Sequence, residues 1–320
     1  MTAASRHVRI SRKTDEAQDT CSFELIDTEG GGLPPFSAGS HIDVHVAEGL
    51  VRQYSLCNDP RETHRYLIAV LREPASRGGS VAMHAMQEGQ ELRISEPKNH
   101  FSLAHDSRHS VLLAGGIGIT PILCMAERLS MIGASFEMHY CTRSPDRTAF
   151  AERIRASSFA DRVHLHHDSG PATQKLDIAA TLASPQAGAH LYVCGPSGFM
   201  DAVLSAARAA GWTESCLHRE YFAGAAADTT HDGTFEVQLA STGAVIRVAA
   251  DQTVVAALAA VGVRLPVSCE QGVCGTCLTR VIDGTPDHRD MYLTDEEQAR
   301  GDQFTPCCSR AKTPRLVLDL

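Results

Sequence analysis

The chain has 320 residues, more than one ordinary compact domain needs, and this length favours two or three units of about 100 residues each. With 43% hydrophobic and 21% charged residues it has the composition of a soluble globular protein, and its net charge of −9 argues against nucleic acid as the main partner. The sequence contains neither an apolar run of the roughly 18 to 20 residues that crosses a bilayer nor the apolar core of a signal peptide, so we expect a cytoplasmic protein without a membrane span.

The first part of the chain, up to about residue 103, consists of short alternating segments separated by turn residues. Examples are HIDVHV (41–46), QYSLC (53–57) and YLIAVL (66–71). Alternation of apolar and polar residues predicts strands of an antiparallel sheet, and we expect these strands to form a β-barrel.

The second part alternates strands with helices. Apolar strands are predicted at VLLAGG (111–116), FEMHYC (136–141), VHLHH (163–167) and HLYVCG (190–195), with helix-like segments between them. This alternation is typical of an α/β domain with a parallel sheet.

Two strand ends of this second part suggest a dinucleotide site. Gly115, Gly116 and Gly118 follow the first strand and would let a pyrophosphate approach the backbone, while Thr120 and Pro121 would begin the next helix. The strand at 190–195 also ends in a turn before a helix. Two such ends side by side would form a crevice at the carboxyl edge of the sheet.

A third part begins after FAGAAADTTHDG (222–233), a small and polar segment that reads as a linker. The following segments predict a hairpin and a helix, which indicates a small α+β domain. We therefore expect three domains, over residues 1–103, 104–226 and 227–320.

The third domain contains the most specific motif of the sequence. Of eleven cysteines, Cys269, Cys274 and Cys277 form a C-x4-C-x2-C run, and Cys307 and Cys308 follow further along. This spacing is that of plant-type ferredoxins, in which four thiolates hold a 2Fe-2S cluster. Either Cys307 or Cys308 could supply the fourth thiolate.

Two glycines within the cysteine run support the cluster. Gly272 and Gly275 would let the loop turn its backbone amides toward the sulfurs. The alternatives are zinc or a set of buried free thiols. Zinc sites favour C-x2-C pairs, and a C-x4-C-x2-C run with internal glycines does not suit them.

The motifs, taken in order, resemble the phthalate dioxygenase reductase family, which includes vanillate demethylase reductase subunits. They are RQYS (52–55), RGGS (77–80), GGIGITP (115–121), CTRS (141–144), CGP (194–196) and the cysteine run. The resemblance covers essentially the whole chain. It implies a flavin-binding β-barrel domain with FMN, an NAD-binding α/β domain that uses NADH, and a plant-type ferredoxin domain that passes electrons to a separate Rieske-type terminal oxygenase.

The resemblance also implies roles for single residues. Arg52 would bind the flavin phosphate, Tyr54 would pack on the isoalloxazine, Ser55 would hydrogen-bond to flavin N5, and Cys194 would lie near the nicotinamide. Ser55 and Cys194 are thus the expected catalytic residues. The other residues that the resemblance implies are Arg77, Gly78, Gly79 and Ser80 for the flavin phosphate, Arg143, Ser144, Gly195 and Pro196 for the dinucleotide, and Cys307 as the fourth cluster ligand.

Some residues stay outside this expected set or leave a choice open. GSHIDV (39–44) and EPKNHF (96–101) also match strands of the family barrel, and we interpret them as scaffold. Glu220 aligns with an acidic residue near the flavin in related reductases, but an exposed carboxylate is an equal alternative. Arg143 and Arg147 could hold a 2′-phosphate, so the choice between NADH and NADPH remains open.

Two other functions are compatible with the motifs. One is a stand-alone NADH-dependent diaphorase or ferric reductase with a small-molecule acceptor. The other is a nonenzymatic redox sensor, which the complete flavin and nucleotide signatures disfavour.

Overall fold

The computed structural model describes residues 5–74, 76, 78–222 and 232–320. The chain forms two compact units, Met1–Glu220 and Tyr221–Leu320. The predicted division of the first unit near residue 103 remains a prediction. Most of the predicted linker lies outside the described residues.

The first unit begins with an antiparallel sheet. Its strands have the order β4-β3-β6-β1-β2-β5, with β7 paired to β3. A bridge between Leu56, directly after β4, and Ile68 of β5 joins the two ends of this order and closes the barrel. The elements are β1 (Ser5–Ala17), β2 (Thr20–Asp27), β3 (Ser40–Ala47), β4 (Leu50–Ser55), β5 (Tyr66–Leu71), α1 (Gly79–Ala85), β6 (Glu91–Ser95) and β7 (Lys98–Asn99).

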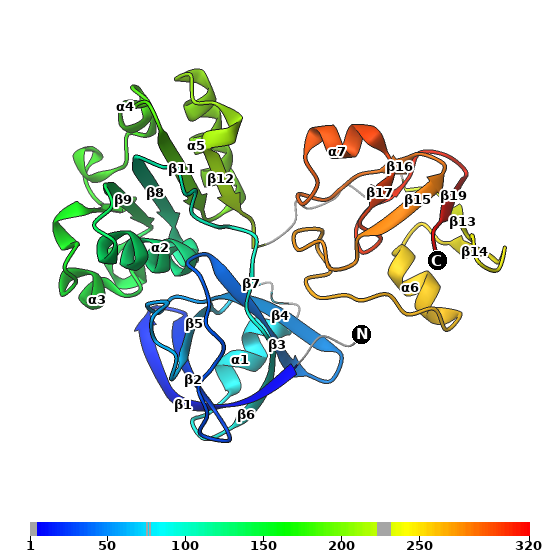
Figure 1. Cartoon of the computed structure of the whole chain (residues 1–320), viewed down its shortest axis with the longest axis horizontal. Helices are drawn as coiled ribbons and strands as arrows, with labels where there is room; N and C mark the ends of the chain where they lie inside the picture. Colours follow the sequence, from blue (N-terminus) through cyan, green and yellow to red (C-terminus); the bar gives the residue numbers. More distant parts are fainter. Residues whose placement is uncertain (1–4, 75, 77, 223–231) are drawn as a thin grey trace. The chain divides into compact units, whose positions relative to one another are not determined.

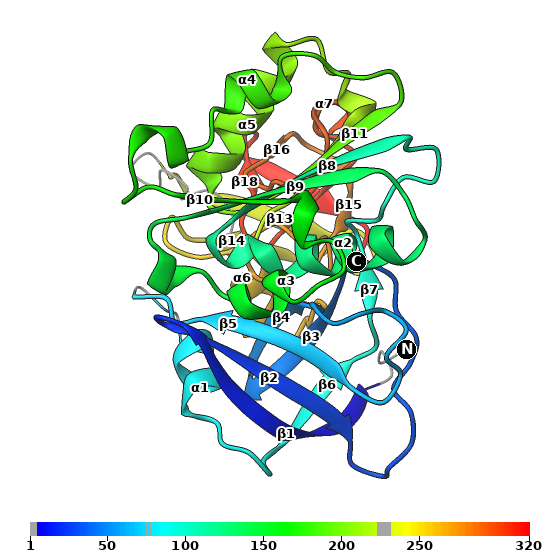
Figure 2. The same cartoon turned by 90° about the vertical axis from the view of Figure 1, so that its left-hand side faces the viewer.

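The barrel interior is built by alternate residues of its strands. Phe23 and Leu25 of β2 are completely buried, as are Ile42 and Val44 of β3, and all four belong to one apolar cluster. The helix α1 adds Met83 to this cluster, and Figure 2 shows the helix beside the barrel strands. Period-two alternation thus has the predicted consequence of one apolar face inside and one polar face outside.

The same unit continues with a parallel sheet of order β10-β9-β8-β11-β12 (Figure 1). The strand order reverses between β8 and β11, which is where open α/β sheets bind their ligands. The elements are β8 (His109–Gly115), α2 (Ile119–Met131), β9 (Phe136–Thr142), α3 (Ala151–Arg155), β10 (Val163–His167), α4 (Ile178–Leu182), β11 (Ala189–Cys194), α5 (Ser197–Ala209) and β12 (Leu217–Glu220).

The two sheets of the first unit share one apolar core. Ala38, Cys57 and Ala69 from the barrel belong to the same buried cluster as Leu112 of β8 and Ile122 of α2. Because side chains in a close-packed interior have little room to move, this shared core fixes the positions of barrel side chains relative to those of the parallel sheet.

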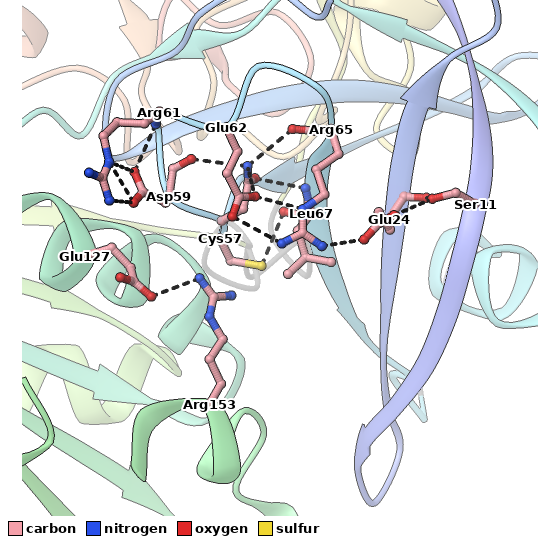
Figure 3. Close-up of polar contacts among 11 residues, drawn as sticks. Ser11, Glu24, Cys57, Asp59, Arg61, Glu62, Arg65, Leu67, Glu127 and Arg153 are labelled. Carbon is pink, nitrogen blue, oxygen red and sulfur yellow. Dashed lines mark hydrogen bonds and ion pairs between the residues drawn. The ribbon is translucent and has the colours of Figure 1, made fainter. Parts of the chain in front are cut away.

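Polar side chains lie beside this shared core. Figure 3 shows the Arg65 guanidinium between Glu24 and Glu62 of the barrel. Separately, the guanidinium of Arg153 in α3 donates to Glu127 of α2 at 3.2 Å. These ion pairs are partly exposed, so their contribution to stability is small beside that of the apolar core.

The second unit is a mixed sheet of order β14-β13-β19-β15-β17 with α6 packed on it. The predicted hairpin is confirmed as the antiparallel pair β13 and β14, and the predicted helix as α6, whose first turn is capped by Thr253. The elements are β13 (Phe235–Leu239), β14 (Val245–Val248), α6 (Val254–Ala260), β15 (Thr279–Asp283), β16 (Pro286–Asp287), α7 (Asp295–Arg300), β17 (Gln303–Phe304), β18 (Arg310–Ala311) and β19 (Arg315–Leu318).

The expected fold class is confirmed, with an antiparallel barrel, a parallel α/β sheet and a small α+β domain. Within the described part of the chain, every helix is too short or too polar to cross a bilayer.

Candidate flavin, nucleotide and cluster sites

The strand β4 brings the first predicted flavin residues to the end of the barrel. Arg52 extends across the start of α1, where a Cβ added to Gly79 would lie 2.6 Å from its Cγ and 2.8 Å from its Nε. Gly78, which precedes the helix, has a φ of 91°. The RQYS and RGGS motifs therefore meet in space, and any larger residue at position 79 would force the Arg52 side chain to move.

The structure describes Ser80 and Tyr54, two further residues of the predicted flavin site. Ser80 accepts a hydrogen bond from the Glu73 amide at 3.1 Å, and its hydroxyl donates to Ser76 at 2.9 Å, so it closes the turn before α1. Arg77 lies outside the described residues. Tyr54 is half-buried against the barrel core.

The two predicted dinucleotide turns pack backbone against backbone. A Cβ on Gly118 would lie 2.2 Å from the carbonyl oxygen of Cys194, and one on Gly195 would lie 2.9 Å from the Cα of Gly115. Gly116 has a φ of 53°, in the left-handed region. These glycines let the turns after β8 and β11 approach each other, which forms the predicted edge at the point where the strand order reverses.

The other predicted dinucleotide residues surround the same edge. Arg143 is exposed just past the carboxyl end of β9, and Ser144 follows it. Thr120, fully buried in the first turn of α2, donates its hydroxyl proton to the Ile117 carbonyl at 3.1 Å. Pro196 precedes the first residue of α5. Thr120 therefore supports the turn, whereas Arg143 is accessible to a ligand.

The barrel and the parallel sheet meet at Ser55, the first predicted catalytic residue. The Ser55 hydroxyl donates to Oε2 of Glu220 at 3.2 Å. Glu220 lies opposite Cys194 in the register of β12 and β11, and Cys194 is completely buried. The structure thus brings Ser55 and Cys194 together around a third side chain that sequence reasoning left out.

The Glu220 carboxyl is mostly buried, so the alternative of an exposed carboxylate at this position is wrong. Its side chain exposes 14% of its surface, and burial raises its pKa to about 8. Burial, and then the nearby Glu220, raise the pKa of the Cys194 thiol well above its usual value. At neutral pH Glu220 therefore keeps its proton and the Cys194 thiol is neutral. The sequence signal for Glu220 was the resemblance to related reductases, which carry an acidic residue near the flavin at this place.

The cysteine run forms two pairs of sulfurs. Cys269 hydrogen-bonds to Cys274 and lowers the pKa of its thiol to about 5. Cys307 hydrogen-bonds to Cys277 and lowers the pKa of that thiol below its usual value. All four side chains are buried, with exposures between 4% and 7%. Two irons that take two thiolates each need such an arrangement, so the donor set fits a 2Fe-2S cluster.

Backbone geometry of the loop agrees with a cluster-binding turn. The Gln271 amide donates to the Cys269 sulfur at 3.3 Å, and the Thr276 amide to the Cys274 sulfur at 3.5 Å. Gly275 has a φ of 67°, and a Cβ there would lie 2.3 Å from the Tyr292 ring. The loop thus turns amides toward sulfur as expected.

The two adjacent cysteines differ in their partners. Cys307 hydrogen-bonds to Cys277 and to Cys308. The Cys308 sulfur also lies 3.3 Å from the Thr305 hydroxyl and 2.4 Å from where a Cβ of Gly272 would be. This geometry agrees with Cys307 as the fourth ligand, which remains a prediction.

Comparison with protein-family models matches two segments of the chain. Residues 237–312 match the model described as the 2Fe-2S iron-sulfur cluster binding domain. Residues 94–217 match the model described as the N-terminal domain of dimethylamine monooxygenase subunit DmmA-like proteins.

Individual proteins match the whole chain. A vanillate O-demethylase oxidoreductase from Pseudomonas putida is 62% identical over 97% of this chain and 98% of its own. The solved structure of a phthalate dioxygenase reductase, described as a modular structure for electron transfer from pyridine nucleotides to 2Fe-2S, has a TM-score of 0.79 and 39% identity over 99% of this chain and 98% of its own. An intact type IV self-sufficient cytochrome P450 monooxygenase has a TM-score of 0.85 and 39% identity over 99% of this chain, which corresponds to 41% of its own.

Proposed function

Because this chain belongs to the family of vanillate O-demethylase oxidoreductases and phthalate dioxygenase reductases, we propose that it takes hydride from NADH onto FMN and delivers single electrons to a separate Rieske-type terminal oxygenase. The chain is an oxidoreductase component of an oxygenase system, with a flavin- and nucleotide-binding reductase fold and a 2Fe-2S ferredoxin domain. When bound, a flavin takes two electrons as hydride and gives them up one at a time, and a 2Fe-2S cluster carries one electron.

The protein's own part in hydride transfer is carried by the pocket at the meeting of the two sheets. Ser55 holds a hydroxyl at the end of β4, oriented by its hydrogen bond to Glu220. Glu220 keeps a proton at neutral pH because of its burial. Cys194 contributes a neutral, apolar surface in place of a nucleophile, since its thiol stays protonated. These groups exclude water and add no net charge beside the reacting atoms.

The remaining cofactor contacts are part of the proposal. Arg52, which reaches the start of α1, would pair with the flavin phosphate, and FMN is preferred to FAD from the order of the modules. The proposed dinucleotide contacts are the glycine turns after β8 and β11 together with Arg143 and Ser144. The proposed cluster ligands are Cys269, Cys274, Cys277 and Cys307.

The preference for NADH has support from one ion pair. Arg147, one of two arginines that could hold a 2′-phosphate, lies 3.3 Å from the carboxylate of Asp19. A phosphate would have to compete with this carboxylate for the same guanidinium.

The observation that carries the proposal is that one chain holds both the buried, uncharged side chains of Ser55, Cys194 and Glu220 at one place and two pairs of buried cysteines. The test is an anaerobic titration with NADH, followed by absorbance and electron paramagnetic resonance, with extraction of the flavin. We expect yellow protein that releases FMN, and a 2Fe-2S signal that appears as NADH is added. Extracted FAD would contradict the cofactor assignment, and zinc in place of iron and sulfide would contradict the cluster.

The alternative, a stand-alone diaphorase or ferric reductase, is separated by adding an oxygenase. Both functions predict NADH-dependent reduction of artificial dyes. Only the proposed function predicts NADH-dependent hydroxylation or demethylation when a Rieske-type oxygenase and its substrate are present. The likeness to a cytochrome P450 monooxygenase makes a P450 the informative second acceptor in this assay.

A further inference from the structure

A line of polar side chains runs from Glu220 across one face of the barrel. His41 of β3 pairs with Ser55 of β4 in the sheet register, so both side chains lie on the same face. The two oxygens of the Glu220 carboxyl face these two residues, with Oε2 at 3.2 Å from Ser55 Oγ and Oε1 at 4.0 Å from His41 Nδ1. His41 itself is only 5% exposed. The carboxyl is therefore held between two neighbouring strands.

The next residue along the line is Gln53. Its amide nitrogen lies 2.9 Å from Oδ1 of Asp43 and 3.2 Å from Nε2 of His41. An amide flip would place the Gln53 oxygen against the Asp43 carboxylate, so the nitrogen must face both groups. One N–H of this amide then donates to Asp43 and the other donates to His41.

The protonation of His41 follows from these contacts. Burial lowers its pKa to about 4, so the imidazole is neutral and carries one N–H. Because Nε2 accepts from Gln53, the single proton sits on Nδ1. That nitrogen is the one that faces Glu220.

The outer end of the line is anchored at the surface. Lys98, which pairs with His41 across β7 and β3, donates to Oδ2 of Asp43 at 2.6 Å. The Asp43 carboxylate is thereby fixed as an acceptor on both of its oxygens. The direction of every hydrogen bond in the line follows from this one charged pair.

We propose that His41 is a positioning residue for the reductase site, held in its Nδ1–H form by Gln53 and Asp43 and donating that proton's hydrogen bond to Glu220. The inference rests on the proposed function, because it concerns the pocket in which hydride is transferred. At 4.0 Å the contact is longer than a hydrogen bond, and such contacts in unliganded enzymes shorten when the ligands bind. His41 then holds Oε1 while Ser55 holds Oε2.

Other charged groups near His41 and Glu220 do not change the protonation that we assign to His41. Asp43 raises the pKa of His41, whereas His100 and Lys98 lower it, and all three effects are smaller than that of burial. Around Glu220 the neighbours are the Ser55 hydroxyl and the neutral Cys194 thiol. A hydrogen bond from Nδ1–H favours the charged form of Glu220, so its loss raises the pKa of that carboxyl.

The test compares two variants of the same shape at one position. His41→Asn keeps an N–H in the place of Nδ1, whereas His41→Leu removes it. The assay is NADH oxidation with ferricyanide by the full chain with its cofactors, measured as kcat/KM from pH 5 to 10. For His41→Leu we expect a fall of about tenfold, as for one lost hydrogen bond in a buried site, and a shift of the pH break of Glu220 to higher pH. His41→Asn should retain the wild-type pH break.

Two further variants guard against a purely structural explanation. His45→Leu, on the same strand but partly exposed beside Arg93, should behave as wild type. Gln53→Leu frees the proton of His41 to move to Nε2, so it should shift the pH break in the same direction as His41→Leu with His41 intact. Flavin content and melting temperature are measured for each variant.

The outcomes separate the two proposals. Provided that the wild type oxidises NADH, either of two results would overturn the role of His41. One is an unchanged pH profile in His41→Leu, and the other is an equal loss of kcat/KM in His41→Asn and His41→Leu. A wild-type chain that holds flavin but does not oxidise NADH would overturn the proposed function and this inference with it.

Discussion

The cluster loop and the reductase pocket are built in opposite ways. Three of the four proposed cluster ligands come from nine consecutive residues, 269–277, whose backbone turns bring the sulfurs together. The pocket draws Ser55, Cys194 and Glu220 from three strands of two sheets. A site of the first kind depends on spacing and glycines, whereas a site of the second kind depends on how sheets pack.

This difference explains why the sequence indicated more of the residues of the cluster loop than of the site around Ser55. A local loop encodes its chemistry in a spacing that can be recognised directly. An assembled pocket contains residues such as His41 and Glu220 whose neighbours in sequence give no sign of what they will contact. We therefore expect mutations in the loop and around Ser55 to have clearly different effects.

The largest effect is expected from the fourth cysteine of the cluster. Cys307→Ser removes the sulfur that pairs with Cys277, and we expect loss of most of the iron and of electron delivery to an oxygenase. Reduction of ferricyanide by NADH should persist, because Ser55 and Glu220 lie in the other unit. Iron analysis and electron paramagnetic resonance measure the first effect, and dye reduction the second.

Cys308→Ser is the matched control for this change. Its sulfur contacts the Thr305 hydroxyl, and we expect the cluster to remain. If Cys308→Ser loses iron and Cys307→Ser keeps it, the ligand assignment is wrong.

An intermediate effect is expected where the two dinucleotide turns touch. Gly118→Ala would place a Cβ 2.2 Å from the Cys194 carbonyl oxygen, so the turns must separate. Overpacking of this kind costs roughly 1–3 kcal/mol of stability and should weaken NADH binding at least tenfold. Denaturant unfolding and the KM for NADH measure the two effects.

Gly198→Ala provides the comparison within the same crevice, since a Cβ at this helical position meets nothing within 4 Å. It should be neutral or stabilise by about 0.4–1 kcal/mol. Equal effects of the two substitutions would argue against close approach of the turns.

A third effect concerns the pH dependence of stability. The pKa of Glu220 is about 8 in the folded protein and near 4.5 when unfolded, so the folded state holds the proton more tightly. Its contribution to stability is full below pH 4.5 and is lost as the pH rises through 8. Glu220→Gln keeps the shape and removes the titration.

Between pH 5 and pH 8 the free energy of unfolding of Glu220→Gln should therefore rise relative to that of wild type, by at most about 1.4 kcal/mol for each pH unit. The difference between the two melting temperatures should rise with it. A difference that stays constant over this range would mean that Glu220 is charged in the folded protein.

The fold was predictable to a large extent because its signals are periodic. Alternation in segments such as HIDVHV and YLIAVL gave strands β3 and β5, and apolar runs followed by glycine gave β8 and β11. The closure of the barrel through Leu56 and Ile68 had no such signal, because it is a contact between strands that are distant in the sheet order.

The candidate sites were predictable where a motif is local. Arg52 and Gly79 each belong to a recognisable string, and the structure places one across the other. His41 lay in a segment interpreted as scaffold, and Glu220 was set aside. Both become candidates only through the register of β3 with β4 and of β11 with β12.

Composition, periodicity and the spacing of cysteines and glycines by themselves determined the fold class, the presence of a cluster loop and the dinucleotide edge, since each depends on residues close together in the chain. Tertiary structure alone decided that Glu220 is buried, that it meets Ser55 from another sheet, and which nitrogen of His41 faces it. The physical reason is that burial and hydrogen-bond direction are properties of the packed environment, and no single segment carries them.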